Sequence, residues 1–202
     1  VTNNNIISAM TVLPRERFVP ESSTEIAYVD TAIQVANDRY IVAPMVLARL
    51  IQEANVSSDD LVQVIGCGTG YAAAILSNMS KAVVLVEDQS EVCDKAEALF
   101  IELGIDNVLV FKTDLVNGCK KQAPFNIIII CGAVEEIPIN LVNQLVEGGR
   151  IITMILASEG VSYPTTKATI LTKYNGKLVE KEVFEVNTPK IKSFNKDKVF
   201  KF

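Results

Sequence analysis

Residues 61–71 constrain what this chain can fold into more than any other stretch. They read Leu-Val-Gln-Val-Ile-Gly-Cys-Gly-Thr-Gly-Tyr, so five residues suited to a buried parallel strand are followed directly by Gly66, Gly68 and Gly70. Tyr71 then opens an alanine-rich stretch that suits the start of a helix. Such a strand, glycine turn and helix start form the nucleotide site of many α/β proteins, because glycines let the backbone approach a ligand and free N–H groups attract electron-rich oxygens. We therefore predict an α/β fold with a nucleotide site here; the alternative is a tight turn without a ligand.

A second apolar strand, residues 83–86, ends in two acidic residues, Glu87 and Asp88. A carboxylate at the end of the second strand of such a fold can accept hydrogen bonds from both ribose hydroxyls of a bound nucleoside. Glu87 and Asp88 are therefore candidate cofactor-binding residues.

The spacing of the glycines separates two kinds of ligand. A dinucleotide fingerprint, Gly-x-Gly-x-x-Gly, would place its third glycine where Tyr71 stands. The pattern Gly-x-Gly-x-Gly instead resembles the first motif of the S-adenosylmethionine-dependent methyltransferases, in which the loop wraps the methionine part of the ligand. A dehydrogenase is the less favoured alternative. The resemblance makes the whole loop a candidate cofactor-binding segment: Gly66, Cys67, Gly68, Thr69, Gly70 and Tyr71.

Composition narrows the class of protein further. The 202 residues suit one domain with a full core, and a net charge of −5 argues against a large nucleic-acid interface. The chain has no histidine, and its four cysteines form no Cys-x-x-Cys pair, so we expect no cysteine–histidine zinc site, no metal and no histidine-dependent triad. No apolar run has the length of a membrane span and no signal-peptide pattern opens the chain. We expect a cytoplasmic protein with reduced, buried thiols, a monomer or weak homodimer.

Upstream of the glycine turn, two motifs resemble a specific family. Pro-Arg-Glu-Arg-Phe-Val-Pro at 14–20 and Ala-Tyr-Val-Asp at 27–30 are similar to the N-terminal signature of the protein-L-isoaspartate O-methyltransferases. The likeness continues through residues 103–110, 123–130 and 144–150, and the last nine residues resemble a divergent branch of the family. It implies S-adenosyl-L-methionine as cofactor, S-adenosyl-L-homocysteine as product, and a protein or peptide with an isoaspartyl carboxylate as methyl acceptor.

Family positions add further candidates for the cofactor site. Asp114 stands where the family places an adenine-contacting aspartate, and Leu115 follows it. Cys131 and Gly132 stand at the end of the fourth strand, where the family has Thr-Ala.

The acceptor side departs from the family pattern. The Thr and Ser that help to hold the isoaspartyl group are replaced by Tyr40 and Val42, and valine cannot form a hydrogen bond with a carboxylate. Arg39 could supply a different carboxylate clamp, or could be a solvated loop residue. Our catalytic-side candidates are Asp30, Arg39 and Tyr40. The alternatives are a methyltransferase with another acceptor, such as a small molecule, or a non-catalytic S-adenosylmethionine-binding homologue.

Two departures concern the cofactor side. Val64 replaces the acidic residue two positions before the first glycine, and Asn126 replaces an aspartate. We expect each change to weaken cofactor binding by about 1 kcal/mol, the value of one hydrogen bond.

Periodicity predicts a mostly parallel, doubly wound sheet with a C-terminal antiparallel hairpin around Asn175-Gly176. This arrangement resembles the Rossmann-like fold of the S-adenosylmethionine-dependent methyltransferases. Within residues 1–202 we expect a helical, substrate-side segment (1–58), a Rossmann-like core (59–187) and a tail (188–202). Glu135 and Glu136 are expected in a solvated helical turn, and 190–198 as an exposed tail, with capping of the site as the alternative. The expected helices are 5–13, 43–54, 88–103 and 137–146, the last closed by Gly148-Gly149, and further strands are expected at 125–131 and 150–156.

Overall fold

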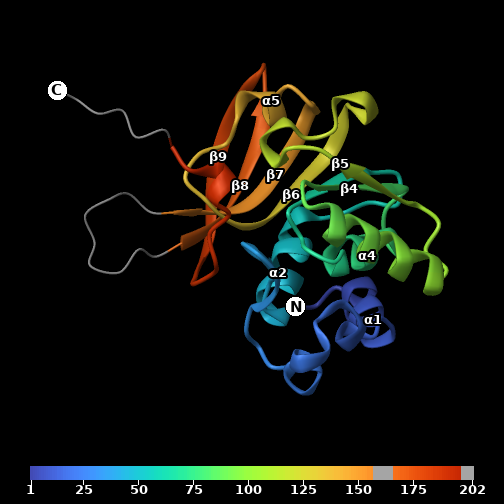
Figure 1. Cartoon of the computed structure of the whole chain (residues 1–202). Coiled ribbons are helices and arrows are strands. Elements are labelled where there is room, and N and C mark those ends of the chain that lie inside the picture. Colours follow the sequence, from blue (N-terminus) through green and yellow to red (C-terminus); the bar gives the residue numbers. More distant parts are fainter. Residues whose placement is uncertain (157–165, 197–202) are drawn as a thin grey trace.

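The computed structural model of the chain describes residues 1–156 and 166–196, and its main feature is one sheet of seven strands (Figure 1). The order across the sheet is β5-β4-β3-β6-β7-β8-β9. Strands β3 to β7 run parallel to their neighbours, and β8 and β9 are antiparallel. The strands are β3 (Leu61–Ile65), β4 (Ala82–Glu87), β5 (Val108–Lys112), β6 (Phe125–Val134), β7 (Leu145–Leu156), β8 (Thr166–Tyr174) and β9 (Lys177–Val186). The predicted fold class is confirmed.

The strand order fixes where a ligand can bind. The chain adds β4 and β5 on one side of β3, and then returns to add β6 and β7 on the other side. The order therefore reverses between β3 and β6, and open α/β sheets bind ligands outside the carboxyl ends of the strands at such a point. The glycine turn at 66–70 directly follows β3, at this edge.

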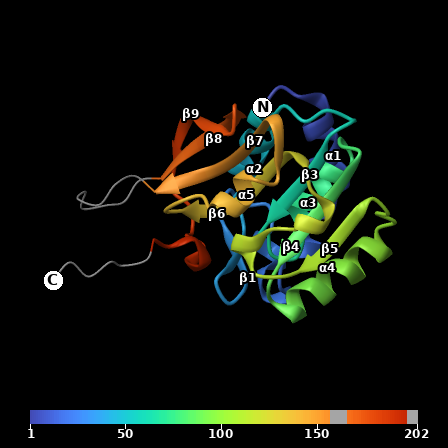
Figure 2. The same cartoon turned by 90° about the horizontal axis from the view of Figure 1, so that it is seen from above.

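The two faces of the sheet are covered unequally. On one face, apolar side chains of β3, β4, β6 and β7 pack with the helices α1 to α4. On the other face, the cover consists of short helical turns: η3 (Leu115–Asn117), α5 and η5 (Lys192–Phe194). Figure 2 shows the helices on either side of the sheet. The helices are α1 (Asn4–Val12), α2 (Pro44–Ala54), α3 (Tyr71–Ser77), α4 (Ser90–Glu102) and α5 (Ile139–Val142).

The helix predicted at 137–146 is wrong. Only α5 is helical there, and β7 already begins at Leu145. The reason is that the chain returns to the sheet early, where the backbone N–H of Phe125 donates to the carbonyl of Gln144 at 2.7 Å. Gly148 and Gly149 consequently lie in an irregular part of β7 and do not cap a helix.

The predicted C-terminal hairpin is confirmed, and a second hairpin was not predicted. Asn175 and Gly176 join β8 to β9 with φ values of 50° and 73°, as a two-residue hairpin turn requires. Near the N-terminus, β1 (Ile33–Ala36) pairs with β2 (Arg39–Ile41) in a separate two-stranded sheet. Its turn places Arg39 at the start of β2.

The expectation of an exposed tail at 190–198 is wrong for residues 190–196, which belong to a segment, 188–196, that we call the C-terminal strap. The strap pairs with β6: the N–H of Ile191 donates to the carbonyl of Ala133, and the N–H of Ala133 donates to that of Pro189, both at 2.9 Å. Ile191 and Phe194 are buried, because they pack on the otherwise thinly covered face of the sheet. In Figure 2 the red turn of this segment lies next to the end of β6. The expected tail residues 197–198 lie outside the described residues.

Candidate functional site

The glycine turn has the backbone geometry that its sequence requires. Gly66, Gly68 and Gly70 have φ values of +66°, +63° and +95°, a region that side-chain-bearing residues rarely adopt. The N–H of Gly66 donates to the carbonyl of Val86 at 3.1 Å, which joins the turn to the end of β4. The turn and the acidic pair after β4 therefore lie side by side, as predicted.

Thr69 of the turn and Tyr71, the first residue of α3, face the N-terminal segment. The hydroxyl of Thr69 donates to the carbonyl of Phe18, and the buried ring of Tyr71 meets that of Phe18 edge-on at a centroid distance of 5.2 Å. Arg15 lies over the Tyr71 ring at 4.9 Å and donates to the carbonyls of Ala27 and Val42. These contacts fasten the N-terminal segment to the turn.

Glu87 is fully buried at the end of β4, and its two oxygens differ. Oε1 accepts hydrogen bonds from Nε of Arg39 at 2.8 Å and from the N–H groups of Asp88 and Gln89 at 2.9 and 3.4 Å. Oε2 is buried and, among the residues that the structure describes, has no hydrogen-bond partner. Burial raises the pKa of Glu87 to about 6, against the opposing effect of the Arg39 charge.

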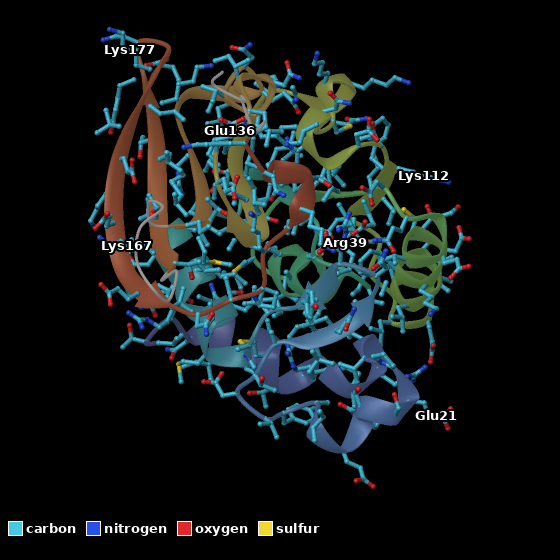
Figure 3. All side chains as sticks on the ribbon, turned by 60° about the vertical axis from the view of Figure 1, so that its left-hand side comes forward. Glu21, Arg39, Lys112, Glu136, Lys167 and Lys177 are labelled. Atoms are coloured by element: carbon cyan, nitrogen blue, oxygen red, sulfur yellow. The ribbon has the colours of Figure 1, made fainter. Side chains whose placement is uncertain are left out.

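Arg39 is not a solvated loop residue, since its side chain is 2% exposed. It reaches Glu87 through Nε, Oδ1 of Asp88 through Nη2 at 2.6 Å, and the carbonyl of Asp38 through Nη1 at 2.7 Å. Figure 3 shows Arg39 in the middle of the molecule, whereas Glu21 and Lys177 lie at the periphery. Arg39 therefore binds two carboxylates of its own chain, Glu87 and Asp88. The sequence did not predict this buried position.

The other catalytic-side candidates lie apart from Arg39. Tyr40 and Val42 line a small, mainly apolar pocket together with Cys67 and Cys131, and it has no room for a water molecule. Oδ1 of Asp30 instead accepts from the N–H of Met45 at 2.9 Å, in the first turn of α2. The structure thus places Tyr40 beside Cys67 and Cys131, two candidates for the cofactor site. Asp30 instead caps the first turn of α2.

The Cys131 thiol in this pocket is not an activated nucleophile. A hydrogen bond with Cys67, followed by burial, raises the pKa of the Cys131 thiol well above its ordinary value. The expectation of buried cysteines is confirmed for all four, which carry no disulfide.

The C-terminal strap covers the glycines at the switch point. A methyl group placed on Gly132 would lie 2.5 Å from Cγ1 of Ile191, and one on Gly66 would lie 3.0 Å from its Cδ1. Ile191 therefore fills the space that the missing side chains leave. Similarly, Val35 lies against Gly68, where an added methyl group would be 2.5 Å from its Cγ2.

Polar contacts hold the strap in place. Glu135 pairs with Nζ of Lys190 and accepts from the N–H of Lys196 at 2.6 Å, so it is not in the solvated helical turn that we expected. The N–H of Lys192 donates to Asp38 at 3.1 Å, in the turn of the β1–β2 hairpin. The strap and the hairpin that carries Arg39 therefore close over the site together.

The remaining candidates divide between the site and the scaffold. Leu115 is buried against Gly66, and Asp114 is exposed beside Asn117. Val64 is buried in β3, two residues before the turn.

The expected effect of Asn126 on the cofactor is wrong, because Asn126 lies at the opposite end of β6, where its Oδ1 accepts from the N–H of Leu61 at 2.9 Å.

At one end of this site, the chemistry of a buried acceptor that has no partner among the described residues suits the cofactor that the resemblance implies. The free, buried oxygen of Glu87 is an acceptor that a ribose hydroxyl would satisfy. Sequence reasoning missed three residues that shape the site: Arg15, Val35 and Ile191. Within residues 1–156 and 166–196 there is no group of metal-ligating side chains, and no helix long and apolar enough to cross a membrane.

Comparison with known proteins gives a consistent result. Residues 1–187 match the profile of the family described as Protein-L-isoaspartate(D-aspartate) O-methyltransferase (PCMT). Over 181 residues the chain is 34% identical to a protein-L-isoaspartate O-methyltransferase of Gloeobacter violaceus, covering 90% of this chain and 86% of that protein. It is 36% identical over 160 residues to one of Brucella anthropi, covering 79% and 74%.

Solved structures agree with the fold. One protein-L-isoaspartate O-methyltransferase superposes with a TM-score of 0.81 at 27% identity over 93% of this chain, which spans 61% of that longer chain. A Plasmodium falciparum structure with S-adenosyl-L-homocysteine superposes with a TM-score of 0.78 at 21% identity, covering 96% and 92% of the two chains.

Proposed function

Because this chain belongs to the protein-L-isoaspartate O-methyltransferase family, we propose that it is an S-adenosylmethionine-dependent methyltransferase that acts on isoaspartyl carboxylates of damaged proteins. The observation that carries the proposal is the pairing of a Gly-x-Gly-x-Gly turn with a buried glutamate that keeps one oxygen free. A cytoplasmic location and a monomer or weak homodimer remain part of the proposal, from composition alone.

The residues of the site suit a reaction that depends on positioning. The cofactor, when bound, supplies a methyl group on a sulfonium, which an acceptor oxygen displaces in line. A carboxylate acceptor is already ionised near neutral pH, so it needs no general base. This agrees with a chain that has no histidine and whose Cys131 thiol is held protonated.

Each part of the site has a distinct task in this proposal. Glu87 would hold the ribose through Oε2, and Asp114 and Leu115 would flank the adenine. The backbone of the glycine turn would receive the methionine part. That last task requires Ile191 to move away from Gly66 and Gly132, since its side chain now fills the space against both.

Calorimetric titration with S-adenosyl-L-homocysteine tests the cofactor site directly. We expect binding at micromolar concentrations and methyl transfer from S-adenosylmethionine to an isoaspartyl peptide, with the aspartyl peptide as matched control. No heat of binding at millimolar ligand would contradict the proposal, and binding without transfer would restrict it to the cofactor.

A second candidate is a methyltransferase with a different acceptor. The observation that favours it is that Val42, buried beside Tyr40 in apolar surroundings, offers a carboxylate no hydroxyl from position 42. Restoring the family pattern with Tyr40→Thr and Val42→Ser should raise isoaspartyl methylation if the acceptor is an isoaspartyl group. A variant that binds the cofactor normally and stays inactive on the isoaspartyl peptide would favour the second candidate.

A further inference from the structure

We propose that Arg39 is the positioning residue of the ribose-binding carboxylate: it holds Oε1 of Glu87 so that Oε2 stays free to accept hydrogen bonds from the ribose hydroxyls. The inference rests on the proposed function and gives Arg39 a role other than the acceptor clamp expected from the sequence.

The two carboxylate oxygens of Glu87 differ in their hydrogen bonds, and this difference is the first argument. Oε1 accepts three donors: Nε of Arg39 and the N–H groups of Asp88 and Gln89. Oε2 accepts none from the described residues, although it is equally buried. A buried acceptor without a partner is costly, so a ligand hydroxyl that donates to it gains more than an exposed contact would give.

The donors of Arg39 provide the second argument. Its Nε, Nη1 and Nη2 groups point at Glu87, the carbonyl of Asp38 and Asp88, and the side chain is 2% exposed. An arginine so placed has no exposed face on which to bind the carboxylate of a protein substrate. It can, however, fix the orientation and the charge of Glu87.

The charges around Glu87 explain why this buried carboxyl needs a cation beside it to stay ionised. Burial raises the pKa of this carboxyl, and Arg39 is the main influence that lowers it. Asp88 faces Glu87 from the following loop, Lys112 is its partner on β5, and Cys93 faces it from α4. Cys131 approaches from β6, and Asp38 and Lys192 lie behind Arg39. The Cys93 thiol has a pKa of about 11, so it does not titrate together with Glu87.

The rival interpretation is that the ion pair only fastens the β1–β2 hairpin to the sheet. A fastening role would affect every ligand of the site equally. A positioning role acts through Glu87 and therefore affects only ligands that carry ribose hydroxyls, and only while Glu87 is ionised.

The experiment titrates the wild type, Arg39→Lys and Arg39→Gln with S-adenosyl-L-homocysteine and with its 2′,3′-dideoxy form, across the pH range in which Glu87 titrates. We expect the wild type to prefer the natural ligand by about tenfold or more, as for hydrogen bonds to a charged group. Arg39→Gln should lose most of this preference and should need a higher pH to bind, because the pKa of Glu87 rises without the cation. Arg39→Lys should keep part of the preference.

The outcomes that overturn the inference are distinct from failure of the proposed function. If Arg39→Gln is folded and keeps the full preference for the natural ligand, Arg39 is only a fastening residue. If the wild type binds neither ligand, the proposed cofactor site is wrong and the inference fails with it. Should Arg39→Gln not fold, Arg39→Lys decides: its preference for the natural ligand must be smaller than that of the wild type, and an unchanged preference overturns the inference.

Discussion

The two ends of the candidate cofactor site are built differently. At the nucleoside end, Glu87 is fixed by Arg39 and two backbone N–H groups and keeps one oxygen free. At the glycine end, the space against Gly66 and Gly132 is filled by Ile191 of the C-terminal strap. One end is prepared for a ligand, and the other is occupied by the chain itself.

This difference suggests the order in which a ligand would enter. In the proposed function, Glu87 would bind the nucleoside at a place that Ile191 does not fill, whereas the methionine part would need the strap to leave the glycines. The energy of the first contact can then offset the cost of the second, which is the usual relation between a binding site and a segment that must open.

The largest expected effect on stability comes from a substitution at the nucleoside end. Glu87→Ala leaves the Arg39 guanidinium buried without its main partner, and removal of one member of a buried ion pair typically costs about 3–5 kcal/mol. We expect a loss of this size in the free energy of unfolding, measured by chemical denaturation. Asp88→Asn is the matched control and should cost about 1 kcal/mol or less, because the side chain of Asp88 is 29% exposed.

A double variant sharpens this test. Arg39→Met combined with Glu87→Leu removes both charges and should recover most of the lost stability, since apolar pairs often replace buried ion pairs without cost. If the double variant is as unstable as Glu87→Ala, the pair is not the source of the loss.

The next largest effect comes from a substitution at the glycine end. A methyl group on Gly132 would meet Ile191 at 2.5 Å, so Gly132→Ala should displace the strap and lower the free energy of unfolding by about 1–3 kcal/mol, as overpacking does. Hydrogen exchange of residues 188–196 would report the displacement. Ile191→Ala in the same chain removes the clash but also the packing of Ile191, so it should restore protection only in part. Unchanged exchange of the strap in Gly132→Ala alone would show that Gly132 acts elsewhere.

The sequence predicts the two ends unequally well. The glycine turn and the acidic pair follow from local signals, because φ above zero needs glycine and a strand end exposes the residues after it. The position of Arg39 depends on the β1–β2 hairpin, whose Asn37-Asp38 turn is a weaker signal than Asn175-Gly176.

Two other features depend on contacts between distant segments. The strap is charged and lysine-rich, which indicates a solvated tail. Ile191 and Phe194 are nevertheless buried, because they pack on the thinly covered face of the sheet that also carries α5. Asn126 was placed near the cofactor by family position alone, and the parallel register with β3 puts it at the other end of β6.

The pH dependence of the free energy of unfolding tests the nucleoside end with a smaller expected effect. The folded pKa of Glu87, about 6, lies above its ordinary value, so the folded state binds more protons than the unfolded state between these values. The proton-linked part of the stability from Glu87 is therefore full below its ordinary pKa and is lost as the pH rises through about 6, by at most about 2 kcal/mol. Denaturation of the wild type and Glu87→Gln across this range should show the slope in the wild type alone; parallel curves would contradict it.

The smallest expected effect concerns the surface contacts of the strap. Lys190 pairs with Glu135 at a partly exposed position, and such pairs contribute about 1 kcal/mol or less. Lys190→Ala should therefore leave the global free energy of unfolding nearly unchanged while it speeds hydrogen exchange in residues 190–196. Lys167→Ala, which breaks a comparable pair with Glu182 on the β8–β9 hairpin, is the matched control and should leave the strap protected. If the two variants behave alike, the ion pair does not hold the strap, and the closure of the glycine end then depends on the packing of Ile191 and Phe194.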